Sequence, residues 1–106
     1  MTAAQAVAAV RGVQGGVEVV GSGPYADHIR QLLPQGQALL AHETKPEAII
    51  ETTGGLAELA GAMERVDDLG TIVVAGPAPS VACVLDLYGD LHVRGLTLIG
   101  VPFEDA

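Results

Sequence analysis

Four short apolar runs constrain the fold of this chain more than any other feature of its sequence. They cover residues 17–20, 48–52, 71–76 and 96–101, and Val and Ile recur in them. Apolar runs of this length that do not alternate with polar residues are typical of strands buried on both faces of a parallel sheet. The runs therefore predict four parallel strands.

Helical patterns separate these runs. Residues 3–12 are rich in Ala, and residues 25–33 place Tyr25, Ile29, Leu32 and Leu33 on one face of a helix. Further helices are expected over 56–67 and, as a short element, over 86–92. Strands and helices in alternation predict an α/β fold, a three-layer Rossmann-like sandwich with a shortened parallel sheet of four to five strands. With 106 residues, we expect a single truncated Rossmann-like domain over 1–106.

The fifth strand depends on residues 37–41. This QALLA segment lacks β-branched residues, so it is a weaker strand candidate than the other four. If it is a strand, the polar loop 42–47 must cross the sheet without a helix, and the sheet order becomes 2-1-3-4-5. If it is not, the sheet has four strands.

The charge balance excludes several classes of protein. Thirteen Asp and Glu residues against five Lys and Arg give a formal net charge of −8, and no basic run is present. A nucleic-acid partner is not expected, because phosphate neutralisation needs clustered cations. One cysteine allows no disulfide within the chain. No apolar run reaches the roughly 18 residues of a membrane span, and no signal-peptide pattern is present. We therefore expect a cytoplasmic protein that does not contact membranes.

The segment from residue 17 to 26 carries a nucleotide-binding pattern. VEVV is followed by GSGPYA, which matches G-x-G-x-x-(G/A) between a predicted strand and a predicted helix. Gly21 permits the tight turn, Ser22 lies within the loop, Gly23 lets the backbone approach a diphosphate, and Ala26 allows close packing of helix and strand. Glu43 lies 22 residues after Gly21, where an acidic side chain would meet the ribose hydroxyls and would favour NAD over NADP.

A second candidate segment is TTGG at residues 52–55. It follows the predicted strand 48–52, and ligands of open α/β sheets bind at the carboxyl ends of the strands. Thr53 and Gly54 are therefore candidate cofactor-binding residues. The alternative is a structural turn in which Thr53 caps the following helix.

The chain resembles the nucleotide-binding domain of the medium-chain, zinc-type alcohol-dehydrogenase-like dehydrogenases and reductases. The resemblance is carried by PEAIIETTGGLAELAGAMERVDDLGTIVVAGP at 46–77 and DLYGDLHVRGLTLIGVP at 86–102, and more loosely by AAVRGVQGGVEVVGSGP at 8–24. It implies a Rossmann domain that binds NAD. Two departures accompany it, because we expect the catalytic domain to be absent and the segment before residue 48 to be shortened.

These departures favour a stand-alone NAD(P)-binding-like module over a complete oxidoreductase, with a partner protein supplying any catalytic groups. Tyr25 and Asp27 argue against NAD(P) binding, since Tyr25 could fill part of the cofactor groove and Asp27 would repel a phosphate. One alternative is a cofactor-free dimeric scaffold or interaction protein. Another is a small enzyme that reuses the cleft for non-redox chemistry in a biosynthetic pathway.

Catalytic groups for such an enzyme would come from His42, Glu43, Thr53 and Tyr25. His42 is the best placed of the three histidines to act as a general base, near the expected edge of the cleft. No metal site is expected, because the histidines are dispersed and no metal-ligand spacing joins them.

The run at 96–101 would form an edge strand that is apolar and uncharged. Such an edge aggregates unless it is covered or paired. In the resembled dehydrogenases the corresponding edge pairs across a two-fold axis. We therefore expect a homodimer through residues 96–101.

Overall fold

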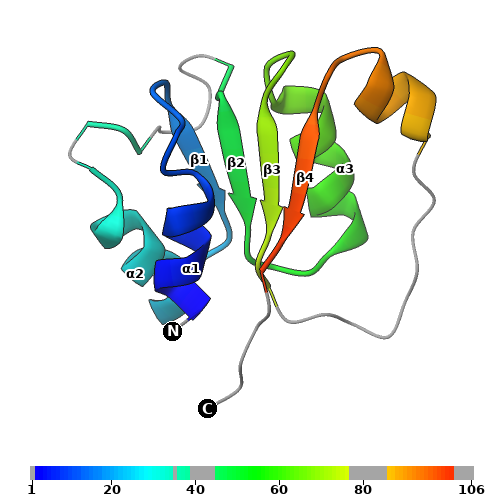
Figure 1. Cartoon of the computed structure of the whole chain (residues 1–106). Helices are drawn as coiled ribbons and strands as arrows, with labels where there is room; N and C mark the ends of the chain where they lie inside the picture. Colours follow the sequence, from blue (N-terminus) through cyan, green and yellow to red (C-terminus); the bar gives the residue numbers. More distant parts are fainter. Residues whose placement is uncertain (1, 35, 39–44, 77–85, 102–106) are drawn as a thin grey trace.

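The computed structural model describes residues 2–34, 36–38, 45–76 and 86–101, and it contains a four-stranded, all-parallel sheet (Figure 1). The strands are β1 (Val17–Val20), β2 (Ala48–Glu51), β3 (Thr71–Val74) and β4 (Thr97–Gly100), in the spatial order β1-β2-β3-β4. The helices are α1 (Thr2–Ala9), α2 (Pro24–Leu32) and α3 (Leu56–Arg65), and a short π-type helical segment, η1 (Leu87–His92), precedes β4. The expected α/β sandwich with a shortened sheet is confirmed.

Consecutive strands start level with one another. Val17 pairs with Ala48, Ala48 with Thr71, and Thr71 with Thr97. Because all four strands run in the same direction, their carboxyl ends meet at one edge, the lower edge of the sheet in Figure 1. The loops that leave this edge hold the candidate site.

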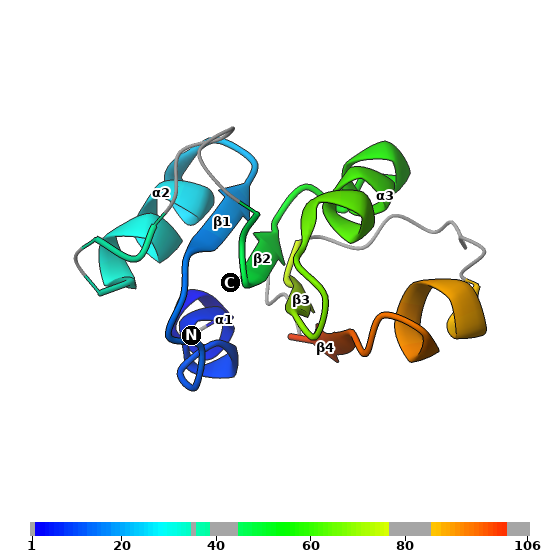
Figure 2. The same cartoon turned by 90° about the horizontal axis from the view of Figure 1, so that it is seen from above.

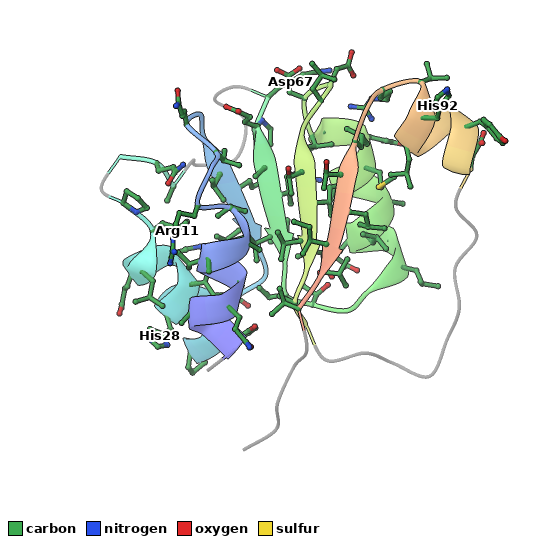
Figure 3. The ribbon with its side chains drawn as sticks, in the orientation of Figure 1. Arg11, His28, Asp67 and His92 are labelled. Atoms are coloured by element: carbon green, nitrogen blue, oxygen red, sulfur yellow. The ribbon has the colours of Figure 1, made fainter. Side chains whose placement is uncertain are left out.

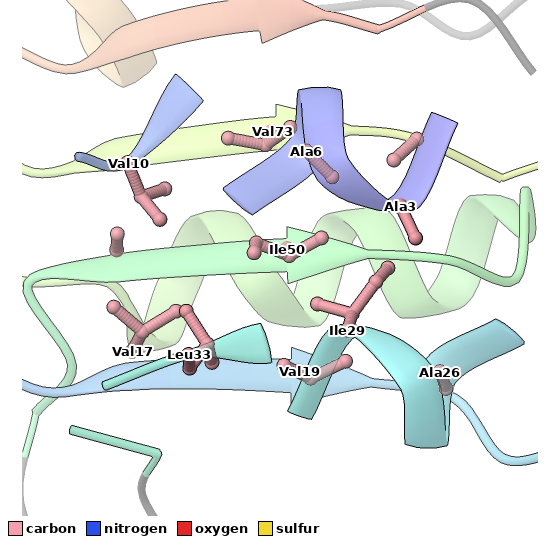
Figure 4. Close-up of a cluster of buried hydrophobic side chains, with 12 residues drawn as sticks. Ala3, Ala6, Val10, Val17, Val19, Ala26, Ile29, Leu33, Ile50 and Val73 are labelled. Carbon is pink, nitrogen blue, oxygen red and sulfur yellow. The ribbon is translucent and has the colours of Figure 1, made fainter. Parts of the chain in front are cut away.

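One face of the sheet is covered by α1, with α2 beside β1, and the opposite face by α3 (Figure 2). Figure 4 shows alanines of α1 lying over β2 and β3, while Ile29 of α2 lies between β1 and β2 and Leu33, directly after α2, lies over β1. Burying a side chain the size of Ile29 stabilises the fold by about 1.5–3 kcal/mol. The buried cluster on this face comprises Ala3, Ala6, Val10, Val17, Val19, Ala26, Ile29, Leu33, Ala48, Ile50, Val73 and Ala75.

On the opposite face, α3 packs against the middle of the sheet. Ala62, Met63 and Val66 of α3 form one buried cluster with Ile49 of β2 and Ile72 of β3. These strand residues alternate with those facing α1, so β2 and β3 are buried on both faces, as their apolar runs predict.

Two arginines tie α3 to the rest of the molecule. Arg65 forms a two-pronged ion pair with Glu18 of β1, with an Nη2–Oε2 distance of 2.6 Å. Arg94, just before β4, donates to the carbonyls of Met63 and Val66 at the end of α3 and to the carboxylate of Asp68. These carbonyls have no partner within the helix, so Arg94 caps its carboxyl end.

Several expected boundaries and contacts differ from the structure. The helix expected over 3–12 ends at Ala9. Leu32 was expected on the buried face of α2 but is 42% exposed, because Ala26 packs against the core instead. The short helix expected over 86–92 is a π-type segment over Leu87–His92. It begins where the Asp86 carboxylate accepts from the amides of Tyr88 and Gly89.

The fifth strand is reduced to a single contact in the described residues. Ala38 forms an isolated parallel bridge with Val17, on the edge of β1 away from β2, and the amide of Val17 donates to the carbonyl of Gln37 at 2.9 Å. This is the edge where the order 2-1-3-4-5 would place residues 37–41. Residues 39–44 lie outside the described part of the chain.

At the other edge of the sheet, β4 is the least buried strand. Thr97 and Gly100 are exposed, Leu98 is 37% exposed and Ile99 is half-buried. Within the described residues, no helix has the length and apolar character needed to cross a membrane.

Candidate functional site

The candidate site is built from the loops that leave the carboxyl ends of β1, β2 and β3. The loop after β1 enters α2 on one face of the sheet, while the loop after β2 enters α3 on the opposite face (Figure 2). The two loops therefore part between β1 and β2. In open α/β sheets this point of divergence is where ligands bind.

Gly21 is required by the packing of β1 against β2. Its φ is +124°, and a Cβ at this position would overlap Oγ1 of Thr52. That hydroxyl donates to the carbonyl of Val20 at 2.6 Å, and the Thr52 amide donates to the same carbonyl at 3.0 Å. The tight turn expected at Gly21 is present, and its first role is to let the two strand ends touch.

Gly23 has a different environment. Its φ is +100°, and among the described residues no atom lies within 4 Å of the place where its Cβ would stand. Gly23 precedes Pro24 at the first position of α2, and no described side chain caps this end of the helix. The backbone at Gly23 is therefore open in the direction of a Cβ, and the first amides of α2 follow directly.

The charge beside this loop differs from the sequence-based expectation. Asp27 lies in the first turn of α2, as predicted, but its carboxylate pairs with Arg30 at 3.0 Å. The same guanidinium donates to the carbonyls of Val19 at 2.9 Å and Gly21 at 2.6 Å. Arg30 thus places a cation under the glycine loop and offsets the negative charge of Asp27.

Glu51 is the buried polar group of the site. It ends β2, its residue is 1% exposed, and its carboxylate accepts from the amides of Thr53 at 2.6 Å and Gly54 at 3.0 Å. The Thr53 hydroxyl also donates to it. Thr53 in turn accepts from the amide of Gly55 at 3.0 Å, next to the start of α3. The donors of the second loop are therefore directed inward, toward Glu51.

Tyr25 crosses the carboxyl ends of the strands. It belongs to the first turn of α2, packs partly buried against the α1 face of the core, and donates its hydroxyl to the carbonyl of Ala75 at 3.0 Å. Ala75 directly follows β3, so the side chain reaches past β2. Behind it the ends of β2 and β3 are in close contact, because a Cβ at Gly76 would overlap the backbone of Thr52.

The structure brings together Gly21, Gly23, Tyr25, Thr53 and Gly54 around the divergence point. Ser22 is exposed within the first loop. His42 and Glu43, the expected base and ribose ligand, lie outside the described residues, as does the end of the third loop from residue 77.

Sequence analysis missed two residues of the site, Arg30 and Glu51. The spacing of three between Asp27 and Arg30 on a helix was a usable signal for their ion pair. A Glu at the end of an apolar run, followed by Thr and Gly, was the corresponding signal for a carboxylate that binds the amides of its own turn.

Groups that could hold a metal do not gather at this edge. Among the described residues no three His, Cys, Asp or Glu side chains form such a cluster. His28 on α2 and His92 on η1 lie on opposite sides of the molecule (Figure 3). The perturbed carboxyl group is Asp68, at the amino ends of the strands, where the hydrogen bond from Arg94 lowers its pKa below the ordinary 3.8.

Comparison with known proteins adds no relative to this description. No protein-family model matches the chain, and no curated protein matches it. The function must therefore be argued from the site itself.

Proposed function

We propose that this chain is a stand-alone nucleotide-binding module of dehydrogenase type, which holds a diphosphate at Gly21–Gly23 and the amino end of α2. The observation that carries the proposal is the open backbone at Gly23, directly between a buried strand and a helix that no described side chain caps. Backbone amides and the helix dipole favour an anion at this position. Arg30 supports the proposal indirectly, because its ion pair offsets the negative charge of Asp27 beside the loop.

NAD is the cofactor that the resemblance implies, and the first loop suits its diphosphate. In this proposal the open space beside Gly23 receives the diphosphate, and a side chain at this position would reduce that space. Gly23 and the first turn of α2 would hold the diphosphate, and Glu43 would meet the ribose. The bound cofactor supplies hydride chemistry, and a partner protein would have to supply the groups that position a substrate.

Amide chemical shifts in ADP titrations test this proposal at the level of individual residues. ADP should move the amide signals of Gly23, Tyr25 and Ala26 at micromolar to submillimolar concentrations, with smaller changes at β4. Inorganic pyrophosphate should move the same signals, more weakly. Shifts that are absent at millimolar ADP, or that centre on another surface, would reject the nucleotide site.

The second candidate function is a dimeric scaffold, and the exposure of β4 favours it. This edge strand carries no charged residue, and Leu98 is partly exposed. Two copies that pair antiparallel along Thr97–Gly100 would form one continuous sheet and satisfy the edge amides and carbonyls. Dimerisation is compatible with nucleotide binding, because β2 and β3 separate β4 from β1 and the glycine loop.

A further inference from the structure

The two halves of a dinucleotide need space on both sides of the glycine loop. With the diphosphate at α2, the adenosine half would lie toward the edge of β1 that Ala38 contacts. The other half must then lie over the ends of β2 and β3. On the α1 face of the sheet Ala3 and Ala6 of α1 lie over β2 and β3, while α3 lies on the opposite face (Figures 2 and 4).

Tyr25 occupies that region. Its hydroxyl is anchored to the Ala75 carbonyl at the end of β3, and its ring packs against the core below. The ring therefore bridges from the first turn of α2 past β2 to β3. A nucleotide half placed over these strand ends would have to displace a hydrogen-bonded and partly buried aromatic side chain.

Within the described part of the chain, the polar donors on that side are already in use. The amides of Thr53 and Gly54 and the Thr53 hydroxyl all donate to Glu51, which is buried. Donors that already bind a carboxylate do not recognise a second polar group without breaking those bonds. Among the described residues, Tyr25 fills the second half of the cleft and the amides there bind Glu51, whereas the first half keeps the open backbone at Gly23.

We infer that the site takes a nucleoside diphosphate such as ADP rather than a dinucleotide, and that Tyr25 sets this limit. The inference rests on the proposed function, since it concerns the same diphosphate position. It disagrees with the NAD site that the resemblance implies. The disagreement is confined to the half of the cofactor beyond the diphosphate.

Calorimetric titrations of the full chain with ADP, ADP-ribose and NADH test the inference. The unchanged protein should bind NADH no more tightly than ADP. In Tyr25→Ala the NADH affinity should rise at least tenfold relative to ADP, because the ring no longer fills the second half. Tyr25→Phe keeps the ring and should retain the ligand preference of the unchanged protein. Tyr88→Ala, at the 76% exposed second tyrosine, is the matched control and should change neither affinity.

The outcomes separate this inference from the proposed function. Binding of NADH at least tenfold tighter than ADP by the unchanged chain would overturn the inference and leave the nucleotide site standing. Binding of none of the three ligands would overturn both. Should Tyr25→Ala fail to fold, the ratio of ADP and NADH affinities in the unchanged chain and in Tyr25→Phe decides the question.

Discussion

Oγ1 of Thr52 stands where a Cβ on Gly21 would have to lie, so β1 and β2 meet at their carboxyl ends without room for a side chain. The hydroxyl is fixed there by its bond to the Val20 carbonyl. The first glycine of the loop is therefore explained by packing alone. At Gly23 no described atom stands near the Cβ position, and glycine is favoured there by the positive φ of +100° instead.

Gly21→Ala should destabilise the fold by about 2–4 kcal/mol, since a positive φ and steric overlap both penalise the added methyl group. Urea denaturation followed by circular dichroism gives the free energy of unfolding. Gly12→Ala is the control, because its Cβ meets no atom within 4 Å, and it should change that free energy by less than about 0.5 kcal/mol. Equal effects of the two substitutions would contradict the packing described for Gly21.

Leu69→Asn should stabilise the protein by about 0.5–1 kcal/mol. Leu69 has a φ of +64° and is 81% exposed, and Asn adopts this backbone conformation more readily than Leu. Thermal denaturation checks the change. Leu56→Asn, at an exposed position in α3, is the control and should not raise stability. A loss of stability in Leu69→Asn would show that the Leu69 side chain makes a stabilising contact.

The ion pair of Asp68 should make stability depend on acid pH. The Arg94 hydrogen bond lowers the pKa of Asp68 in the folded protein below 3.8, so the unfolded chain binds a proton first as the pH falls. This contribution is present above the unfolded pKa and is lost as the pH falls through the folded pKa. Asp68→Asn should therefore lower stability at pH 6 and have little effect below the folded pKa.

Denaturation of Asp68→Asn at pH 6 and at a series of falling acid pH values measures this difference. Glu64→Gln, which removes an exposed carboxyl group with no ion pair among the described residues, serves as the control. A stability difference for Asp68→Asn that is the same at all of these pH values would argue against a role for the Arg94 pair.

Leu98→Lys should convert dimers to monomers, or make the protein insoluble, if β4 pairs with a second copy. A lysine on each of two antiparallel edge strands introduces like charges at the shared edge. Light scattering coupled to size-exclusion chromatography measures the molar mass of the protein in solution. Dimers that persist in Leu98→Lys would exclude this interface, and Leu32→Lys, at an exposed leucine of α2, controls for the added charge.

The sheet could be predicted from the sequence because each strand is a short apolar run and each crossover carries a helical pattern. The four strands, α2 and α3 lie within a few residues of their expected positions. The exposure of Leu32 could not be predicted from helical periodicity, because the position of α1 decides which part of α2 meets the core. The end of α1 at Ala9 likewise follows from packing rather than from the propensity of its alanines.

The sequence pattern indicates most residues of the candidate site, but it does not indicate the hydrogen bonds that join them. The glycine pattern and Tyr25 stand out in the sequence, whereas the bond from Tyr25 to Ala75 joins residues 50 positions apart. Arg30 was missed for the same reason, since its contacts with Val19 and Gly21 exist only when α2 packs beside β1. Long-range pairings of this kind depend on the assembled fold.

ADP binding by Gly23→Ala and Gly36→Ala, measured by calorimetry beside the unchanged chain, decides whether the glycine loop holds a nucleotide. Both glycines have positive φ and open space at the Cβ position, so the two substitutions should destabilise the fold about equally. The nucleotide site predicts micromolar to submillimolar ADP binding that weakens at least tenfold in Gly23→Ala and is unchanged in Gly36→Ala. No binding by the unchanged chain at millimolar ADP, or equal affinities in all three proteins, would contradict it.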